Sequence, residues 1–356
     1  MPRKATSQDV ADLAGVSRSA VSLVLNGRGA GNIAADKQAL IIDAARKLRY
    51  TPNTVALSLR SRRSATIGVV TDAIATSAFG GRLLQGASDA AVAEGYLLLV
   101  IDTQNDAERE RHAYDTLQNR QVDGFLFAAM SLRPYETPPV LHGSPSALAN
   151  CFDPDDGAPA FIPDEVAGSR AATQHLIDNG HRDVVMLTGT TDVMATRLRE
   201  QGYVEAMTAA GLSAARPVTA GWEIDKGHAA AMHALTSGES RPSALFCVND
   251  RAAIGAVLAA VQLGLSIPRD LSVVGYDDDE NVAPFLVPAL TTVRLPHREM
   301  GERAMRVVLD AALDGSDPVL GVERAPSPRT LLECPLVVRD SVAPPPRTRR
   351  LTRAFS

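Results

Sequence analysis

The sequence has few cysteines and no long apolar run. Its 3 cysteines, Cys151, Cys247 and Cys334, are odd in number and lie far apart, which excludes a disulfide framework and C-x-x-C metal or redox motifs. No stretch of about 18 apolar residues suggests a membrane span. The N-terminal segment MPRKATSQDVADLAG lacks the apolar part of a secretory signal. We therefore expect a cytoplasmic protein with reduced thiols and no membrane partner.

Motifs for catalysis and for metal binding are also missing. The 7 histidines include no H-x-x-x-H pair, and the sequence has no P-loop and no G-x-S-x-G nucleophile elbow. The glycine-rich stretch 27–31 follows a helical pattern rather than a strand, so we interpret it as a connector and not as a dinucleotide-binding loop. We expect no enzyme activity, no metal site and no cofactor.

Charge is distributed unevenly along the chain. Residues 1–63 hold 11 Lys and Arg against 4 Asp and Glu, a charge of +7. The remaining residues hold 25 basic and 37 acidic side chains, a charge of −12. A basic N-terminal region on an acidic body indicates a polyanionic partner, and a basic solvated face without a partner is the alternative.

Residues 1–50 have the pattern of a helix-turn-helix domain. Thr6 and Asp9 resemble a capping box, and apolar residues then recur at helical spacing as far as Gly15. Ser17 is a suitable N-cap for a second helix that ends at Asn26. A third helix fits residues 36–49. Two short helices joined by a glycine-containing turn describe a helix-turn-helix, and a small protein-binding bundle is the alternative.

In such a unit the first residues of the second helix enter the major groove of DNA. Arg18 can donate two hydrogen bonds to a guanine edge, Ser19 can bind a base or a phosphate, and Ala20 can contact a thymine methyl group. The predicted DNA-contacting residues of this region are Thr6, Ser17, Arg18, Ser19, Ala20, Ser22 and Asn26.

Residues 51–63 are expected to form a hinge helix that folds only against a partner. Pro52 suits a helix start, but isolated helices shorter than about 12 residues are marginal in water. Leu59 lies among arginines, which is typical of an apolar wedge between base steps of a minor groove. A linker with one incidental leucine is the alternative. The predicted contacts are Asn53, Val55, Ala56, Leu59 and Arg60.

Residues 5–26 and 49–70 resemble the LacI/GalR family of bacterial transcriptional repressors. The pattern D-V-A-x-x-A-G-V-S-x-x-x-V-S-x-V-x-N carries the resemblance, which continues through residues 5–340. It implies a DNA-binding headpiece, a hinge helix ordered by DNA, a core similar to periplasmic sugar-binding proteins, and control by a small-molecule effector. Leu59 matches the hinge leucine that intercalates. Leu23 stands where many members have a guanine-reading arginine, so the operator sequence is expected to differ.

The segment 64–340 alternates short apolar runs with helical patterns. Strands are expected at 66–70, 97–101, 122–127, 184–187, 244–248 and 272–276, and helices at 83–93, 107–120, 166–179, 196–210, 226–235, 250–263 and 298–312. This alternation predicts doubly wound parallel sheets, and the length predicts two lobes. The fold class is thus an all-α headpiece plus an α/β two-lobed core. We expect the chain to cross between lobes near 163, 293 and 322, and residues 341–356 to form a disordered basic tail.

Ligands of open α/β sheets bind beyond the carboxyl ends of the strands. Polar residues follow several expected strands, and the resemblance aligns Arg199, Asn249 and Asp277 with effector-contacting residues. It aligns Trp222 with an aromatic wall, Phe79 with the N-lobe ligand segment and Asn150 with a polar contact near the cleft. Arginine, asparagine and aspartate beside an indole suit a sugar.

These effector residues also have simpler interpretations. Asn249 or Asp277 can cap the following helix, Trp222 can belong to the core, and Asp278 and Asp279 are expected to be solvated.

Together these features predict a transcriptional regulator, a repressor that binds a pseudo-palindromic operator as a homodimer. Its effector is expected to be a mono- or oligosaccharide held in the cleft between the core lobes. A dimer is expected rather than a tetramer, because the tail lacks the heptads of a coiled coil. The alternatives are a solute-binding protein of sugar uptake, which the basic N-terminal region disfavours, and a sugar-handling enzyme, which lacks a nucleophile or metal motif.

Overall fold

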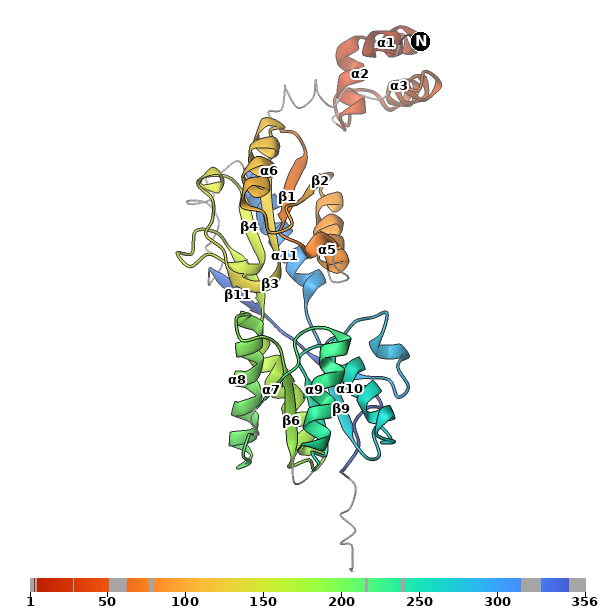
Figure 1. The fold of residues 1–356 in the computed structure, drawn as a ribbon. Helices are drawn as coiled ribbons and strands as arrows, with labels where there is room; N and C mark the ends of the chain where they lie inside the picture. Colours follow the sequence, from red (N-terminus) through yellow and green to blue (C-terminus); the bar gives the residue numbers. More distant parts are fainter. Residues whose placement is uncertain are drawn as a thin grey trace, which may run out of the picture. The chain divides into compact units, whose positions relative to one another are not determined.

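The structure is a computed structural model that describes residues 3, 5–27, 29–50, 63–76, 80–214, 217–237, 241–314 and 328–345. It consists of two compact units, Met1–Ala65 and Thr66–Ser356, which we call the headpiece and the core (Figure 1). Residues 51–62 of the predicted hinge helix, the candidate Phe79 and the tail from residue 346 onward lie outside the described residues.

In the described part of the headpiece, three helices surround a small apolar core. These are α1 (Ser7–Ala14), α2 (Arg18–Leu25) and α3 (Ala35–Lys47). Thr6 and Asp9 form the predicted capping box at the start of α1, and Gly15 ends the helix with a φ of 63°. Val10, Val21 and Ile41 are fully or almost fully buried between the helices. The helix-turn-helix prediction is confirmed.

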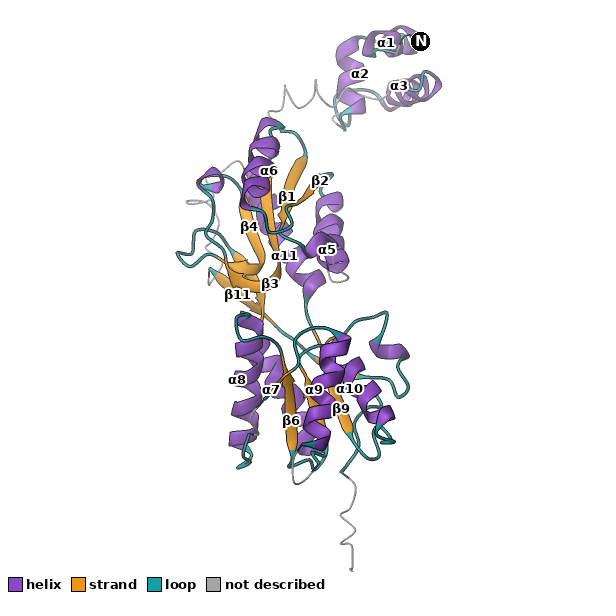
Figure 2. Cartoon of the chain, viewed as in Figure 1, coloured by secondary structure: helices purple, strands orange, loops and turns teal. Residues whose placement is uncertain are grey.

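The core contains two six-stranded sheets, each with helices on its faces (Figure 2). In the sheet of the N-lobe the strand order is β11-β5-β4-β3-β1-β2. Its elements are β1 (Thr66–Thr71), η1 (Ile74–Thr76), α5 (Gly80–Ala93), β2 (Leu97–Asp102), α6 (Ala107–Asn119), β3 (Gly124–Pro134), η2 (Pro139–Leu141), β4 (Ser146–Phe152), β5 (Ala160–Pro163), α11 (His297–Asp314) and β11 (Arg329–Leu332). Helices α5 and α11 pack on one face and α6 on the other.

In the sheet of the C-lobe the strand order is β12-β10-β9-β8-β6-β7. Its elements are α7 (Glu165–Asp178), β6 (Val184–Thr188), α8 (Met194–Ala209), β7 (Val218–Thr219), α9 (Ile224–Thr236), β8 (Ala244–Cys247), α10 (Asp250–Gln262), β9 (Ser272–Asp277), η3 (Ala283–Phe285), β10 (Thr291–Arg294) and β12 (Leu336–Val337). Both sheets are parallel except where β10 meets β12. The two-lobed, doubly wound fold is therefore confirmed.

Within the described ranges, three segments join the lobes. Two crossings follow β5, at 164, and β10, at 295–296, close to the predicted 163 and 293. The third lies between β11 and β12 at 333–335, so the prediction near 322 is wrong.

The C-terminal segment packs on the C-lobe beyond residue 340. Ser341 is buried and donates a hydrogen bond to the Val273 carbonyl at 2.6 Å, and the Ala343 N–H donates to Ser272 Oγ at 3.1 Å. The predicted tail boundary at 341 is therefore too early. Throughout the described ranges, every helix is too short or too polar to cross a membrane.

Candidate functional site

The start of α2 presents an exposed polar surface. Ser17, Arg18 and Ser19 are all exposed, and Ser17 Oγ accepts a hydrogen bond from the Ala20 N–H at 3.2 Å. This N-cap fixes the first turn of the helix, so the neighbouring Arg18 projects from an ordered backbone. Such a turn can present Arg18 and Ser19 to base edges or phosphates.

Three more predicted headpiece residues lie near this surface or at a helix end. Thr6 is exposed at the start of α1, and Asn26 is exposed at the end of α2. Asn26 Nδ2 donates to Ser22 Oγ at 3.2 Å, and Ser22 is half-buried.

Ala20 does not belong to this surface. Its side chain is only 8% exposed and packs in the headpiece core with Val21. The predicted contact of Ala20 with a thymine methyl group stays a prediction, and the inward packing of this side chain with Val21 does not favour it.

In the C-lobe, Arg199 of α8 is held by a buried ion pair. Its Nε and Nη2 donate to the two carboxylate oxygens of Glu165 at 2.8 and 2.9 Å. Its Nη1 donates to the Val248 carbonyl at 2.5 Å, and its guanidinium lies 3.7 Å from the centre of the Tyr276 ring. Although burial opposes the charge, the Glu165 carboxylate raises the pKa of Arg199. Sequence reasoning did not single out Glu165, whose 34-residue separation from Arg199 hides the pair.

Asp277 ends β9 beside this pair. Its Oδ1 lies 3.6 Å from Arg199 Nη1, and its side chain is 8% exposed. Its φ of 105° is in the left-handed region, a strained conformation for a non-glycine residue and one that clusters at binding sites. Burial raises the pKa of the Asp277 carboxyl well above its usual range.

Asp278 was expected to be solvated, and that prediction is wrong. Its carboxylate accepts hydrogen bonds from Arg339 Nη2 at 2.6 Å and Arg294 Nε at 2.7 Å, and its side chain is 2% exposed. Although burial opposes it, these two donors lower the pKa of Asp278. Arg339 comes from the C-terminal segment, which a local sequence pattern does not bring to this position.

Asn249 and Trp222 lie together next to Arg199. Asn249 caps α10, because its Oδ1 accepts from the Ala252 N–H at 2.8 Å, while its Nδ2 donates to the Trp222 carbonyl at 3.1 Å. Trp222 is half-buried against the apolar core of the C-lobe, with its ring centre 5.9 Å from Arg199 Cζ. The structure thus gathers these side chains with Arg199 and Asp277 at one edge of the C-lobe sheet. The simpler interpretations also apply, because Asn249 caps a helix and Trp222 packs against the core.

In the N-lobe, Asn150 and Asp72 order the strand ends. Asn150 is buried with a φ of 58°, and its Nδ2 donates to the Ala129 carbonyl at 3.0 Å. Asp72 Oδ1 accepts from the Met130 N–H at 2.8 Å, and its Oδ2 lies 3.4 Å from Arg133 Nη2. Because these hydrogen bonds hold the segments at the carboxyl ends of the strands, Asp72 positions this edge of the N-lobe sheet.

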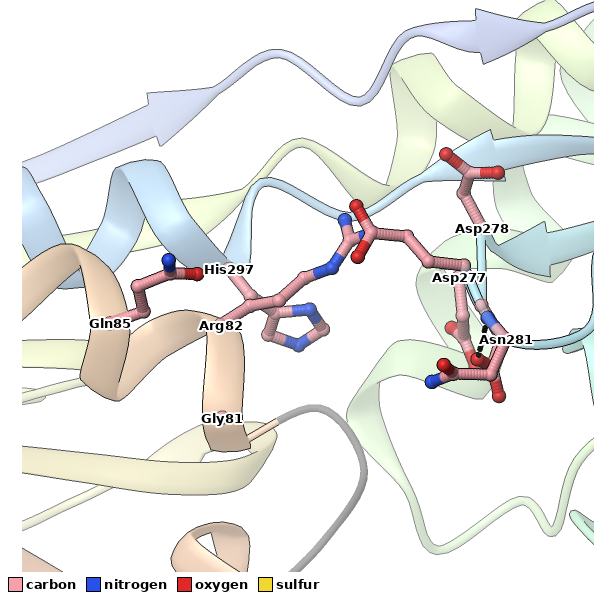
Figure 3. A pocket seen from close by; sticks show the side chains of 9 residues that line it. Gly81, Arg82, Gln85, Asp277, Asp278, Asn281 and His297 are labelled. Carbon is pink, nitrogen blue, oxygen red and sulfur yellow. Dashed lines mark hydrogen bonds and ion pairs between the residues drawn. The ribbon is translucent and has the colours of Figure 1, made fainter.

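A cavity of about 160 Å³ lies between the two lobes (Figure 3). It is lined by Gly81, Arg82 and Gln85 of α5, by residues 277–281 at the end of β9 and in the loop that follows, and by His297 at the start of α11. Arg82 extends from the N-lobe and forms an ion pair with Glu280 of the C-lobe. Burial, together with the nearby Arg82 and Arg199, lowers the pKa of His297 to about 3, so its ring is neutral at pH 7.

Among the predicted effector residues, Asp277 lines this cavity directly. Arg82, Glu280 and His297 were not predicted from the sequence as site residues. The predicted candidates were polar residues directly after expected strands, and these three residues lie elsewhere. Charged residues preceding or following an expected helix were the available signal.

Two family models match the chain. Residues 6–53 match the model described as bacterial regulatory proteins, lacI family, and residues 173–342 match a periplasmic binding protein-like domain.

Curated relatives cover most of the chain. The ribose operon repressor of Escherichia coli strain K12 is 36% identical over 311 residues, covering 86% of this chain and 92% of the relative. The HTH-type transcriptional repressor PurR of Vibrio campbellii is 33% identical over 315 residues, covering 87% and 92%.

Solved structures agree with these relationships. The lac repressor dimer bound to operator and the anti-inducer ONPF is 26% identical, has a TM-score of 0.76, and covers 96% of this chain and 100% of its own. The complex of the transcriptional regulator CelR with cellobiose is 27% identical, has a TM-score of 0.63, and covers 95% and 99%.

Proposed function

Because the chain belongs to the lacI family of bacterial regulatory proteins, we propose that it represses transcription by binding an operator under the control of a small molecule. Its relatives named above are transcriptional repressors, and the protein is a regulator rather than an enzyme. The observation that carries the proposal is the exposed start of α2, where Ser17 caps the helix and Arg18 and Ser19 face solvent. This arrangement suits readout of a major groove.

We propose that the protein acts as a homodimer. Exposed apolar side chains lie on the N-lobe at Val92 of α5 and Leu97 of the edge strand β2, and on the C-lobe at Leu258 and Val261 of α10. Exposed apolar surface and an unpaired sheet edge are features of protein–protein interfaces. A two-fold dimer carries two headpieces, which matches a pseudo-palindromic operator. We also propose that the protein is localised in the cytoplasm, in association with the nucleoid.

The proposed effector site is the cleft that contains Arg199, Asn249, Asp277 and Trp222 in the C-lobe and Asn150 in the N-lobe. The support is the grouping of the C-lobe residues at the carboxyl ends of β6, β8 and β9. Carboxylate, amide and guanidinium groups beside an indole suit a sugar. A ligand that binds one arrangement of the lobes more tightly shifts the population of dimers competent for DNA.

The experiment is selection from a pool of random DNA duplexes with the full-length protein. The proposal predicts enrichment of one inverted repeat, and Arg18→Ala should weaken that enrichment. A matched variant on an exposed ion pair of the core, Arg170→Ala, should leave it unchanged. Failure to enrich any sequence would contradict the proposed function.

A further inference from the structure

The cavity between the lobes has two chemically different ends. Asp277 lies at the C-lobe end, and Arg82 of α5 reaches into it from the N-lobe (Figure 3). The cavity volume of about 160 Å³ is small beside the 300–1,000 Å³ of common ligand pockets. The size favours a ligand near a monosaccharide rather than an oligosaccharide.

The Asp277 end lacks proton donors. In the described part of the chain no hydrogen bond reaches the Asp277 carboxylate, and its ion-pair partner Arg199, at 3.6 Å, is already bound by both oxygens of Glu165. A buried carboxylate that shares its cation with a second carboxylate is incompletely compensated. Sugar hydroxyls that donate to Asp277 would supply what this end lacks.

The Arg82 end lacks a firmly held anion. Burial and the nearby Arg294 lower the pKa of the Arg82 guanidinium, although the carboxylates of Asp278 and Asp279 oppose this. Asp278 is near, but its two oxygens are held by Arg294 and Arg339. Glu280 pairs with Arg82 from a side chain that is 70% exposed.

Two other groups at this end do not replace an anion for Arg82. Asp279 uses one oxygen to accept the Asn281 N–H at 3.0 Å. His297 is neutral at pH 7, so it adds no second cation. The Glu280 side chain is 70% exposed while Arg82 is only 23% exposed, so Glu280 can return to solvent when a ligand anion takes its place on Arg82.

We propose that the effector is an acidic monosaccharide whose carboxylate or phosphate binds Arg82 while its hydroxyls donate to Asp277. This inference rests on the proposed function of the cleft and names the ligand class. Because Arg82 belongs to the N-lobe and Asp277 to the C-lobe, the ligand contacts both lobes and stabilises the arrangement in which these two residues line one cavity. The anion sets specificity and the hydroxyls set orientation.

The test is isothermal titration calorimetry of the full-length protein with matched neutral and acidic sugars. The pairs are glucose with gluconate and with glucose 6-phosphate, galactose with galacturonate, and ribose with ribose 5-phosphate. We expect one acid to bind at least about tenfold more tightly than its neutral partner, as a charge-assisted hydrogen bond predicts. The carboxylate and phosphate arms identify which anion is used.

Three variants make the result specific. Arg82→Gln should remove the preference for the acid, while Arg298→Gln, which breaks the exposed Arg298–Asp89 ion pair, should keep it. Gly81→Leu should block binding while the fold is retained, because a Cβ at Gly81 has no heavy atom within 4 Å and Gly81 lines the cavity. These three comparisons separate loss of the anion contact from loss of the cavity and from a general change of charge.

Equal or tighter binding of the neutral partners, or tightest binding of the ammonium sugar glucosamine, would overturn the proposal and leave an effector site of another specificity. Absence of binding by every sugar would overturn it as well. Operator selection by the same preparation then shows whether the DNA-binding function has failed too.

Discussion

Arg199 and Glu165 join α8 to α7 through two parallel hydrogen bonds of 2.8 and 2.9 Å, with side chains 3 and 2% exposed. The pair lies under the carboxyl ends of β8 and β9, since Arg199 also donates to Val248 and stacks on Tyr276. Arg199 therefore supports the C-lobe edge and sets the charge around Asp277. The predicted contact of Arg199 with an effector has to be tested against this structural role.

The first prediction concerns the stability of this pair. Arg199→Ala leaves the Glu165 carboxylate buried without its cation, so the free energy of unfolding of the core should fall by about 3–5 kcal/mol in urea titrations. The double variant Glu165→Leu, Arg199→Met should recover most of that loss, because it removes both charges and keeps the volume. A loss below about 1 kcal/mol for Arg199→Ala would contradict the structural role.

The second prediction concerns pH. The pKa of His297 is lowered to about 3, against a usual value near 6.5, by burial and by the nearby Arg82 and Arg199. Below pH 6.5 His297 is protonated in the unfolded chain but stays neutral in the folded chain. The contribution of His297 to the free energy of unfolding is therefore fully present above pH 6.5 and is lost as the pH falls towards 3.

Between pH 7 and pH 5 this group should lower the free energy of unfolding by about 2 kcal/mol, and His297→Gln should remove that part of the slope. Urea titrations at both pH values measure it. Identical slopes for the two proteins would show that His297 titrates normally.

The third prediction concerns Arg18. Arg18→Ala should weaken operator binding by about 1–3 kcal/mol if the side chain reads a base, with relaxed specificity at one position. If it binds a phosphate instead, affinity should fall for all sequences and the salt slope by about one unit. Fluorescence anisotropy at several salt concentrations separates these cases. Because Arg18 is exposed, the headpiece should unfold at an unchanged temperature, and a large thermal shift would point to misfolding instead.

The fourth prediction concerns Leu59, which lies outside the described residues. If this side chain is a minor-groove wedge, Leu59→Ala should reduce specific binding more than non-specific binding. Titrations with the selected operator and with unrelated DNA measure both affinities. Equal losses on the two duplexes would eliminate the wedge.

Periodic patterns predicted the helices and the strands that alternate with them, because amphipathic helices and buried strands repeat with fixed spacing. Strand β1 was expected at 66–70 and occupies Thr66–Thr71. The strands β4 (Ser146–Phe152), β5 (Ala160–Pro163), β7, β10, β11 (Arg329–Leu332) and β12 were missed. Five of them have two to four residues, too few to show a period, and the seven-residue β4 is buried except at its two ends and so shows no alternation.

The candidate site was less predictable than the fold. Asn249 and Asp277 could be predicted because each stands at the end of an expected strand, which the local sequence shows. The partners of Arg199, Asp278 and Arg82 are Glu165, Arg339 and Glu280, and each pairing depends on how distant segments pack. No local pattern contains that information.

We propose that ligand binding in the cleft between the core lobes controls the affinity of the headpiece for DNA. The most direct measurement is the Kd of the full-length protein for its selected operator, by fluorescence anisotropy, with and without the sugar that binds in calorimetry. The account predicts a change of about 5- to 150-fold, lost in Gly81→Leu while operator binding itself is retained. An operator Kd that stays the same when the cleft is filled would contradict it.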